Sequence, residues 1–189
     1  MSLFRARDCQ VFLSTSPSWI SGVIRKVRGS RWSHTGILIE NRWTVESTWK
    51  GLQIRDWRKC YLENPKSDYM TFAPAPAFGE ALDRAVSEVM GRHIGCEYGY
   101  LQLLGFLAVW GFARLGLKIQ NPIRDGDGNM VCTEFVDYCF IEAAKGNLAW
   151  ARWLAPLHGN TDSESLGPDD VERWITADGG PFLRGMGPL

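Results

Sequence analysis

The 189-residue chain has no net charge, because 21 lysine and arginine residues balance 21 aspartate and glutamate residues. Without an overall positive field to attract a phosphate backbone, the composition does not predict nucleic-acid binding. Cysteine is also sparse and unpatterned. The chain has five cysteines, an odd number, and none forms a C-x-x-C pair. This pattern argues against a disulfide scaffold and a zinc knuckle, and favours a reducing compartment.

Calcium and other metal sites are not predicted either. Asp125, Asp127 and Asn129 resemble the start of an EF-hand loop. Such a loop needs glycine at its sixth position and glutamate at its twelfth, where this chain has Met130 and Val136. We therefore interpret the acidic segment as a turn, and we expect neither a metal nor an organic cofactor.

Long hydrophobic segments are scarce. The N-terminus, MSLFRARDCQ, lacks an apolar signal core, so a secretory signal is not expected and a cytoplasmic location fits. The longest apolar run, residues 100–117, is interrupted by Gln102 and Arg114. Because a spanning helix needs about 20 apolar residues, we expect a buried or surface-embedded helix. Peripheral membrane contact through residues 100–117 stays open as an alternative.

The pattern of apolar residues predicts a single α+β domain over residues 1–189, without internal repeats or a long linker. Runs rich in β-branched residues predict strands at 10–14, 33–40, 43–49, 51–55 and 68–73, of which the second and third form a hairpin. Helical spacing predicts helices at 19–27, 78–90 and 130–145, besides the apolar run. Gly29 is placed to end the first helix, and Pro168-Asp169-Asp170 indicates a capped turn.

Cys132 lies at the predicted first turn of the helix over residues 130–145. Unpaired N–H groups and the dipole at a helix N-terminus stabilise a thiolate, and the same N–H groups can hold a developing oxyanion. A thiolate is a potent nucleophile at neutral pH. The placement predicts a catalytic cysteine, and a structural cysteine packed under the helix is the alternative.

His34 opens the strand SHTGILIE, where a side chain can face a cleft while the sheet holds its backbone. With an ordinary pKa of about 6.5, an imidazole can accept the proton of a thiol. The other histidines have less rigid settings, since His93 lies in a predicted glycine-flanked loop and His158 in a polar tail. We therefore predict that His34 is the general base, and a surface histidine is the alternative.

Glu46 is the candidate that would orient His34, and the hairpin register decides whether it can. If the loop spans residues 40–42, Ile39 pairs with Trp43, and Glu46 becomes a diagonal neighbour of His34 on one face of the sheet. A two-residue loop would place Glu46 on the opposite face. We predict the three-residue loop or an equivalent bulge, and a solvent-facing carboxylate is the alternative for Glu46.

Five segments, in the order in which they occur, resemble circularly permuted NlpC-type papain-like amidohydrolases, the YiiX-like group. They are SPSWISGVIRKVRGSRWSHTGI, VESTWKGLQIRDW, EYGYLQLLG, VCTEFVDYCF and LGPDDVERW, which span roughly residues 8–175. The resemblance implies a permuted papain-like α+β fold. In such a fold a small antiparallel sheet or half-barrel packs against helices, the sheet histidine precedes the cysteine helix, and the nucleophile stands at a helix N-terminus.

The resemblance also implies roles for single residues. Cys132 matches the nucleophile, His34 the base and Glu46 the orienting residue. Tyr98 matches the family tyrosine and would support the oxyanion or the substrate, together with Thr133, which replaces the usual serine after the cysteine. The long apolar helix exceeds what the family needs, which leaves the substrate class open.

These residues predict a cysteine amidase or peptidase that acts through a thioester acyl-enzyme on cell-wall peptides or small amides. Two alternatives remain. A lipid-directed thiol acyltransferase or lipase would use the same triad on acyl esters, and it fits the apolar run and the nine tryptophans. A non-catalytic binding protein would keep the fold without the activity. The expected partner is a peptide, amide or acyl-lipid substrate, and the sequence predicts no oligomeric state.

Overall fold

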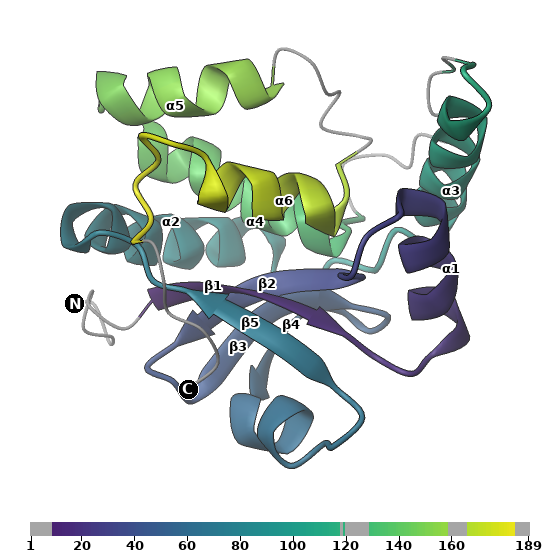
Figure 1. The fold of residues 1–189 in the computed structure, drawn as a ribbon. Coiled ribbons are helices and arrows are strands. Elements are labelled where there is room, and N and C mark those ends of the chain that lie inside the picture. Colours follow the sequence, from purple (N-terminus) through teal and green to yellow (C-terminus); the bar gives the residue numbers. More distant parts are fainter. Residues whose placement is uncertain (1–8, 118, 120–128, 159–165, 184–189) are drawn as a thin grey trace.

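The computed structural model describes residues 9–117, 119, 129–158 and 166–183. Figure 1 shows an α+β fold in which helices are layered over one face of a twisted sheet. The prediction of a small antiparallel sheet packed against helices is confirmed at this level. Two predictions, the lack of a signal core at the N-terminus and the turn at 122–129, fall almost entirely outside the described residues.

Within the described residues, the sheet has five strands in the order β4-β3-β2-β1-β5, and all neighbouring strands are antiparallel. The elements in chain order are β1 (Cys9–Thr15), α1 (Trp19–Arg28), β2 (His34–Ile39), β3 (Trp43–Thr48), β4 (Gly51–Asp56), the π-helical turn η2 (Arg58–Leu62), β5 (Asp68–Phe72), α2 (Pro76–His93), α3 (Tyr100–Arg114), α4 (Cys132–Ala144), α5 (Leu148–His158) and α6 (Pro168–Thr176).

The main hydrophobic core lies between the sheet and helices α2 and α4. Val11 and Ile37 of the sheet pack in one cluster with Leu82 of α2 and Phe135 of α4, and all four side chains are fully buried. The apolar residues that recur at helical spacing along α4 are all buried: Phe135, Val136, Cys139, Phe140 and Ala143. The start of α4 is therefore fixed firmly against β2 and β3.

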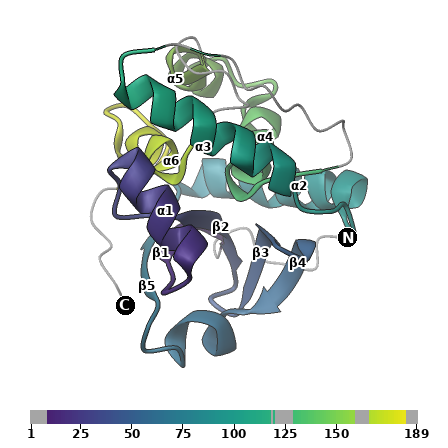
Figure 2. The same cartoon turned by 90° about the vertical axis from the view of Figure 1, so that its right-hand side faces the viewer.

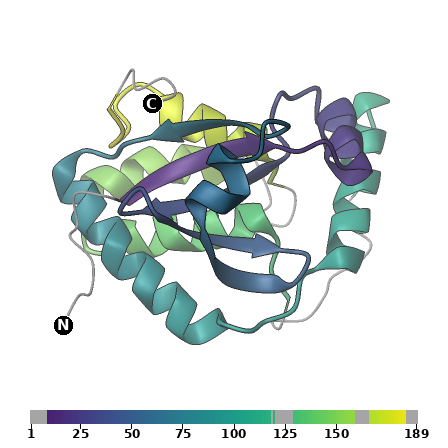
Figure 3. The same ribbon diagram turned by 90° about the horizontal axis from the view of Figure 1, so that it is seen from below.

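Figure 3 shows the opposite face of the sheet, on which η2 lies. This face carries a smaller aromatic cluster. Phe12 and Leu38 from the sheet pack there against Trp57 and Tyr61. The Trp57 and Tyr61 rings stack with centroids 4.5 Å apart, and Phe12 meets each of them edge-on. This packing fixes η2 under the sheet, and π-helical turns of this kind often occur at functional sites.

The hairpin between β2 and β3 has the predicted register. Ile39 pairs with Trp43, so the loop comprises residues 40–42. The first two loop residues both have φ of 52°, the left-handed conformation that tight hairpin loops demand. As expected from this register, His34 and Glu46 extend from the same face of the sheet, and their side chains are in contact.

Three helices differ from the prediction. Helix α2 continues through Gly91 to His93, and the predicted loop begins only afterwards. Helix α5 was not predicted, and Pro156 lies within it. Pro168 begins the full helix α6 and not an isolated turn. Proline is preorganised for the first helical position, and the carboxylate of Asp170 accepts the Gly167 N–H at 2.7 Å, which caps the helix.

Helix α3 corresponds to the apolar run and ends at Arg114. Among the helices of the described residues, none combines the length and the apolar character needed to cross a membrane. Helices α1 and α3 lie side by side on one flank of the fold (Figure 2). The N-terminus of α1 is capped by Ser18, whose hydroxyl accepts the Ser21 N–H at 3.2 Å, and Gly29 ends the helix with φ of 66° as predicted.

Gly36 of β2 provides the space in which His34 and Glu46 meet. A Cβ at Gly36 would lie 2.8 Å from the Phe12 ring and 2.9 Å from the Cβ of Glu46. We expect Gly36→Ala to lower the free energy of unfolding by about 1–3 kcal/mol, because this packed region cannot absorb a methyl group without strain. Urea unfolding followed by circular dichroism measures the effect.

The matched control is Gly22→Ala in α1. A Cβ at Gly22 meets no atom within 4 Å, and alanine is favoured over glycine inside a helix by up to about 1 kcal/mol. This variant should unfold at the same urea concentration as the parent or at a higher one. Equal losses of stability in both variants would contradict the close-packing explanation for Gly36.

Candidate active site

The carboxylate of Glu46 lies at the centre of the site, and its side chain is only 1% exposed. Its Oε2 accepts hydrogen bonds from Nε2 of His34 at 2.6 Å and from the Tyr61 hydroxyl at 2.7 Å. Its Oε1 accepts from the Thr44 hydroxyl at 2.8 Å and from Nη1 of Arg55 at 3.3 Å. Four donors therefore surround one buried acid.

These donors keep the acid charged. Burial alone would raise the pKa of Glu46, because desolvation disfavours the carboxylate. The hydrogen bond and positive charge of His34, the hydrogen bond from Tyr61 and the charge of Arg55 outweigh burial and lower this pKa to about 2. Glu46 is therefore ionised at neutral pH and can hold a positive charge on His34.

His34 is the first residue of β2, and its side chain is partly buried with 23% exposed. Because Nε2 binds Glu46, Nδ1 is the ring nitrogen left to face its other neighbour, Cys132. Burial alone would lower the pKa of His34. The charge of the Cys132 sulfur, the hydrogen bond to it and the contact with Glu46 outweigh burial and raise the pKa to about 10.

Cys132 is the first residue of α4, and 6% of it is exposed. The preceding Val131 has an extended backbone, and its N–H donates to the Glu134 carboxylate at 3.0 Å, which caps the helix. The hydroxyl of Ser47 donates to the carbonyl of Met130 at 2.6 Å. Strand β3 therefore holds the segment before Cys132 through Ser47, and Ser47 is the residue next to Glu46.

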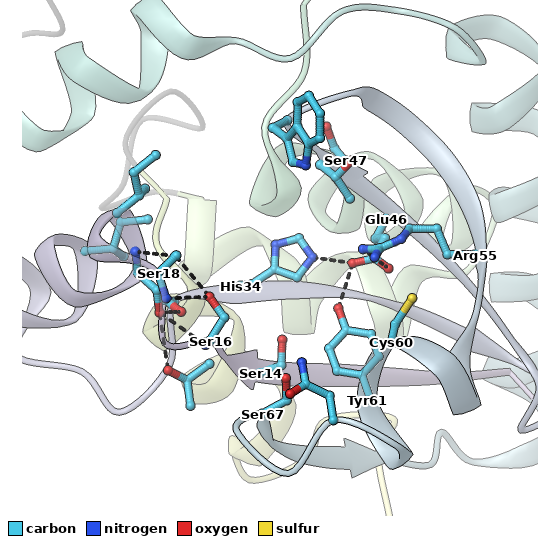
Figure 4. Close-up of a pocket in the computed structure, with 18 of the residues that line it drawn as sticks. Ser14, Ser16, Ser18, His34, Glu46, Ser47, Arg55, Cys60, Tyr61 and Ser67 are labelled. Atoms are coloured by element: carbon cyan, nitrogen blue, oxygen red, sulfur yellow. Dashed lines mark hydrogen bonds and ion pairs between the residues drawn. The ribbon is translucent and has the colours of Figure 1, made fainter.

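A cleft of about 430 Å³ opens on one side of His34. In Figure 4, Ser14 and Ser67 lie below the imidazole ring, Glu46 and Arg55 lie to its right, and Ser16 and Ser18 lie to its left. Nine serine and threonine residues line this cleft, while its charged side chains are those of His34, Glu46 and Arg55. The cleft therefore combines many hydroxyl groups with few charged side chains.

Tyr98 and Thr133 have different positions relative to the cysteine. Tyr98 lines the cleft and also a smaller void of about 10 Å³ beside Cys132. Thr133 lines the smaller void, but its hydroxyl donates to the carbonyl of Leu166 at 3.0 Å. The Thr133 side chain thus attaches α4 to the segment before α6, and only its backbone N–H stands at the helix N-terminus.

Sequence reasoning missed three of the four donors to Glu46. Thr44 stands two residues before Glu46 on the same face of β3, and Arg55 pairs with Thr44 across the strands. Strand alternation and hairpin register could have identified both of them. Tyr61 reaches the site from η2, and nothing in the local pattern of the sequence indicates that it would. Among the described residues, no three His, Cys, Asp or Glu side chains gather closely enough to bind a metal ion.

Tyr61→Phe tests the donor network. The ring is buried and phenylalanine keeps its packing, so the change removes one hydrogen bond to a charged acceptor, with an expected cost of about 1.5–3 kcal/mol at pH 7. Because the pKa of folded Glu46 lies near 2 and its ordinary value near 4.5, this stabilisation is present above pH 4.5 and is lost as the pH falls towards 2. Urea unfolding at several pH values measures both effects.

Tyr69→Phe is the control for this variant. Tyr69 packs edge-on against the same Trp57 ring, with centroids 4.9 Å apart, but its hydroxyl makes no hydrogen bond to Glu46. We expect a change below about 0.5 kcal/mol, as for substitutions away from buried networks. A loss for Tyr61→Phe that does not shrink in acid would show that the carboxylate is not the relevant acceptor.

Comparison with known proteins finds no family model that matches this chain and no curated protein that matches it. The functional inference therefore depends on the residues of the site and on their geometry.

Proposed function

We propose that the protein is a cysteine hydrolase, an amidase or peptidase, in which Cys132, His34 and Glu46 form the catalytic triad. One observation carries the proposal: the imidazole of His34 stands between the sulfur of Cys132 and the buried carboxylate of Glu46, which it meets at 2.6 Å. A nucleophile, a base and a group that orients the base are the parts that acyl transfer requires.

In the proposed reaction, His34 takes the proton of the Cys132 thiol, and the thiolate attacks the carbonyl carbon of an amide. A carbon–sulfur bond forms. When the tetrahedral intermediate collapses, the carbon–nitrogen bond breaks and His34 gives its proton to the leaving nitrogen. Water then attacks the thioester while His34 accepts a proton from it, and a carboxylic acid and the free thiol are released.

The start of α4 would stabilise the negative oxygen of the tetrahedral intermediate. The first N–H groups of a helix have no partners within the helix, and they carry partial positive charge. The backbone N–H groups of Cys132 and Thr133 belong to this first turn. Tyr98, which lines both the cleft and the void at Cys132, is the side chain placed to contact the substrate.

The order of the triad along the chain supports a permuted papain-like architecture. The sheet that carries His34 and Glu46 precedes the helix that begins with Cys132. The same order occurs in the YiiX-like group that the sequence resembles. We include this architecture in the proposal, with the antiparallel sheet as the part that supplies base and orienting acid.

Alkylation rates test the nucleophile. We expect iodoacetamide to modify Cys132 of the folded protein at pH 7 faster than Cys60, although Cys60 is more exposed. Burial raises the pKa of Cys60 above its ordinary value, whereas Cys132 has a helix N-terminus and His34 beside it. His34→Ala should slow the modification of Cys132 at least about tenfold, as measured by peptide mass spectrometry. Faster labelling of Cys60 would contradict an activated Cys132.

Trapping of the acyl-enzyme tests the reaction. Brief incubation with p-nitrophenyl acetate should add one acetyl group to the intact protein, and hydroxylamine should remove it, as expected for a thioester. Cys132→Ala should abolish the adduct. Cys96→Ala is the control, because Cys96 lies outside the cleft and should leave the adduct unchanged. An adduct that persists in Cys132→Ala would overturn the assignment.

A further inference from the structure

A second hydrophobic cluster, separate from the main core, lies beside the nucleophile. Its buried members are Ile24 of α1, Leu103, Phe106 and Trp110 of α3, and Val131, which directly precedes Cys132. Helices α1 and α3 contact each other along this flank of the fold (Figure 2). The region around the Cys132 sulfur is therefore bounded by the apolar faces of two helices.

This cluster opens into the cleft. Ile24 and Leu103 line both the small void at Cys132 and the large cleft at His34, and Ile20 continues the apolar lining within the cleft. We call these three residues the apolar strip. The void itself, about 10 Å³, holds no more than a water-sized group. Anything larger that is bonded to the sulfur must extend along the apolar strip into the cleft.

Two hydroxyl groups near the sulfur are already occupied within the protein. The Ser33 hydroxyl bonds to the Ser21 hydroxyl at 2.6 Å, and the Thr133 hydroxyl donates to the carbonyl of Leu166 at 3.0 Å. Each of these hydroxyls therefore already has a partner within the protein. The surroundings of the sulfur therefore act mainly as apolar surface.

The surroundings of the imidazole are different. Ser14, Ser67 and Asn64 line the cleft with His34, and Figure 4 shows the two serines below the ring, whereas Arg55 lies beside it, next to Glu46. In acyl transfer, the acyl group is bonded to the nucleophile, and the leaving group is the part that receives the proton of the base. The structure thus assigns different surroundings to the two halves of a substrate.

We infer that the substrate's acyl group is an aliphatic chain that lies along the apolar strip, and that its leaving group is polar and uncharged. The inference rests on the proposed function, since it takes Cys132 as the acylated residue and His34 as the proton donor. It adds the chemical class of the acyl group, which the triad alone does not determine.

A series of p-nitrophenyl esters tests the acyl class, because every member has the same leaving group. Burial of one methylene contributes about 0.8 kcal/mol, or roughly a fourfold gain in kcat/KM. We expect kcat/KM to rise from acetyl through butanoyl to hexanoyl, with a gain of about tenfold or more in each two-carbon step while the chain lies on the strip. The ratio of hexanoyl to acetyl kcat/KM is the measured quantity.

Ile20→Asn and Leu103→Asn should each lower this ratio about tenfold or more. The control is Leu104→Asn, which changes an exposed neighbour on the same helix (55% exposed) and should leave the ratio as it is. A ratio does not depend on the fraction of protein that is folded, so partial unfolding of the Leu103 variant does not obscure the result. The half-buried Ile20 provides a milder change at the same surface.

The outcomes separate the two proposals. Turnover of the acetyl ester that requires Cys132, with a flat or falling dependence on chain length, would overturn the aliphatic assignment and leave the hydrolase intact. Equal effects of Leu104→Asn and Ile20→Asn on the ratio would also overturn the aliphatic assignment and leave the hydrolase intact. Ester turnover that persists in Cys132→Ala, or no turnover of any ester, would overturn the proposed function and the inference with it.

Discussion

The buried charge of Glu46 is the constraint on which the rest of the site depends. A carboxylate with almost no exposure is costly unless it is paired and hydrogen-bonded. Its donors come from four separate elements: His34 from β2, Thr44 from β3, Arg55 from β4 and Tyr61 from η2. Satisfying one acid therefore fixes the positions of three strands and a helical turn. The same contacts hold the imidazole in the orientation that general base catalysis needs.

Different contacts hold the proposed nucleophile, Cys132, and the wall of the site that α1 and α3 form beside it. Ser47, the neighbour of Glu46, binds the segment before Cys132 through the Met130 carbonyl, so β3 holds both ends of the triad. The wall formed by α1 and α3 is attached elsewhere. Arg28 of α1 donates twice to Asp169 of α6, at 2.6 Å each, and lies 4.9 Å from the Trp110 ring of α3. The surface formed by α1 and α3 is thus held by contacts other than the donors to Glu46.

Local chemistry explains which parts of this site could be predicted from the sequence. Turn residues set the hairpin register within a few positions, so the pairing of His34 with Glu46 followed from the loop length. Helix caps and apolar spacing predicted α1 and α4 in the same way. The donation by Tyr61 could not be predicted, because it depends on how η2 packs under a finished sheet. The hydroxyl of Thr133 shows a related limit: a motif indicates which residue is present but not which partner its side chain meets.

In the proposed mechanism, the charges of the reacting groups cancel. A thiolate at Cys132 and the carboxylate of Glu46 face the imidazolium of His34 and the guanidinium of Arg55, whose side chain is 40% exposed in the cleft. A site without net charge gives no long-range advantage to cationic or anionic substrates. Selection among substrates must then come from direct contacts, and these differ on the two sides of the imidazole. Because the proposed triad could attack many acyl carbonyls, the inferred specificity rests on the apolar surface beside the sulfur.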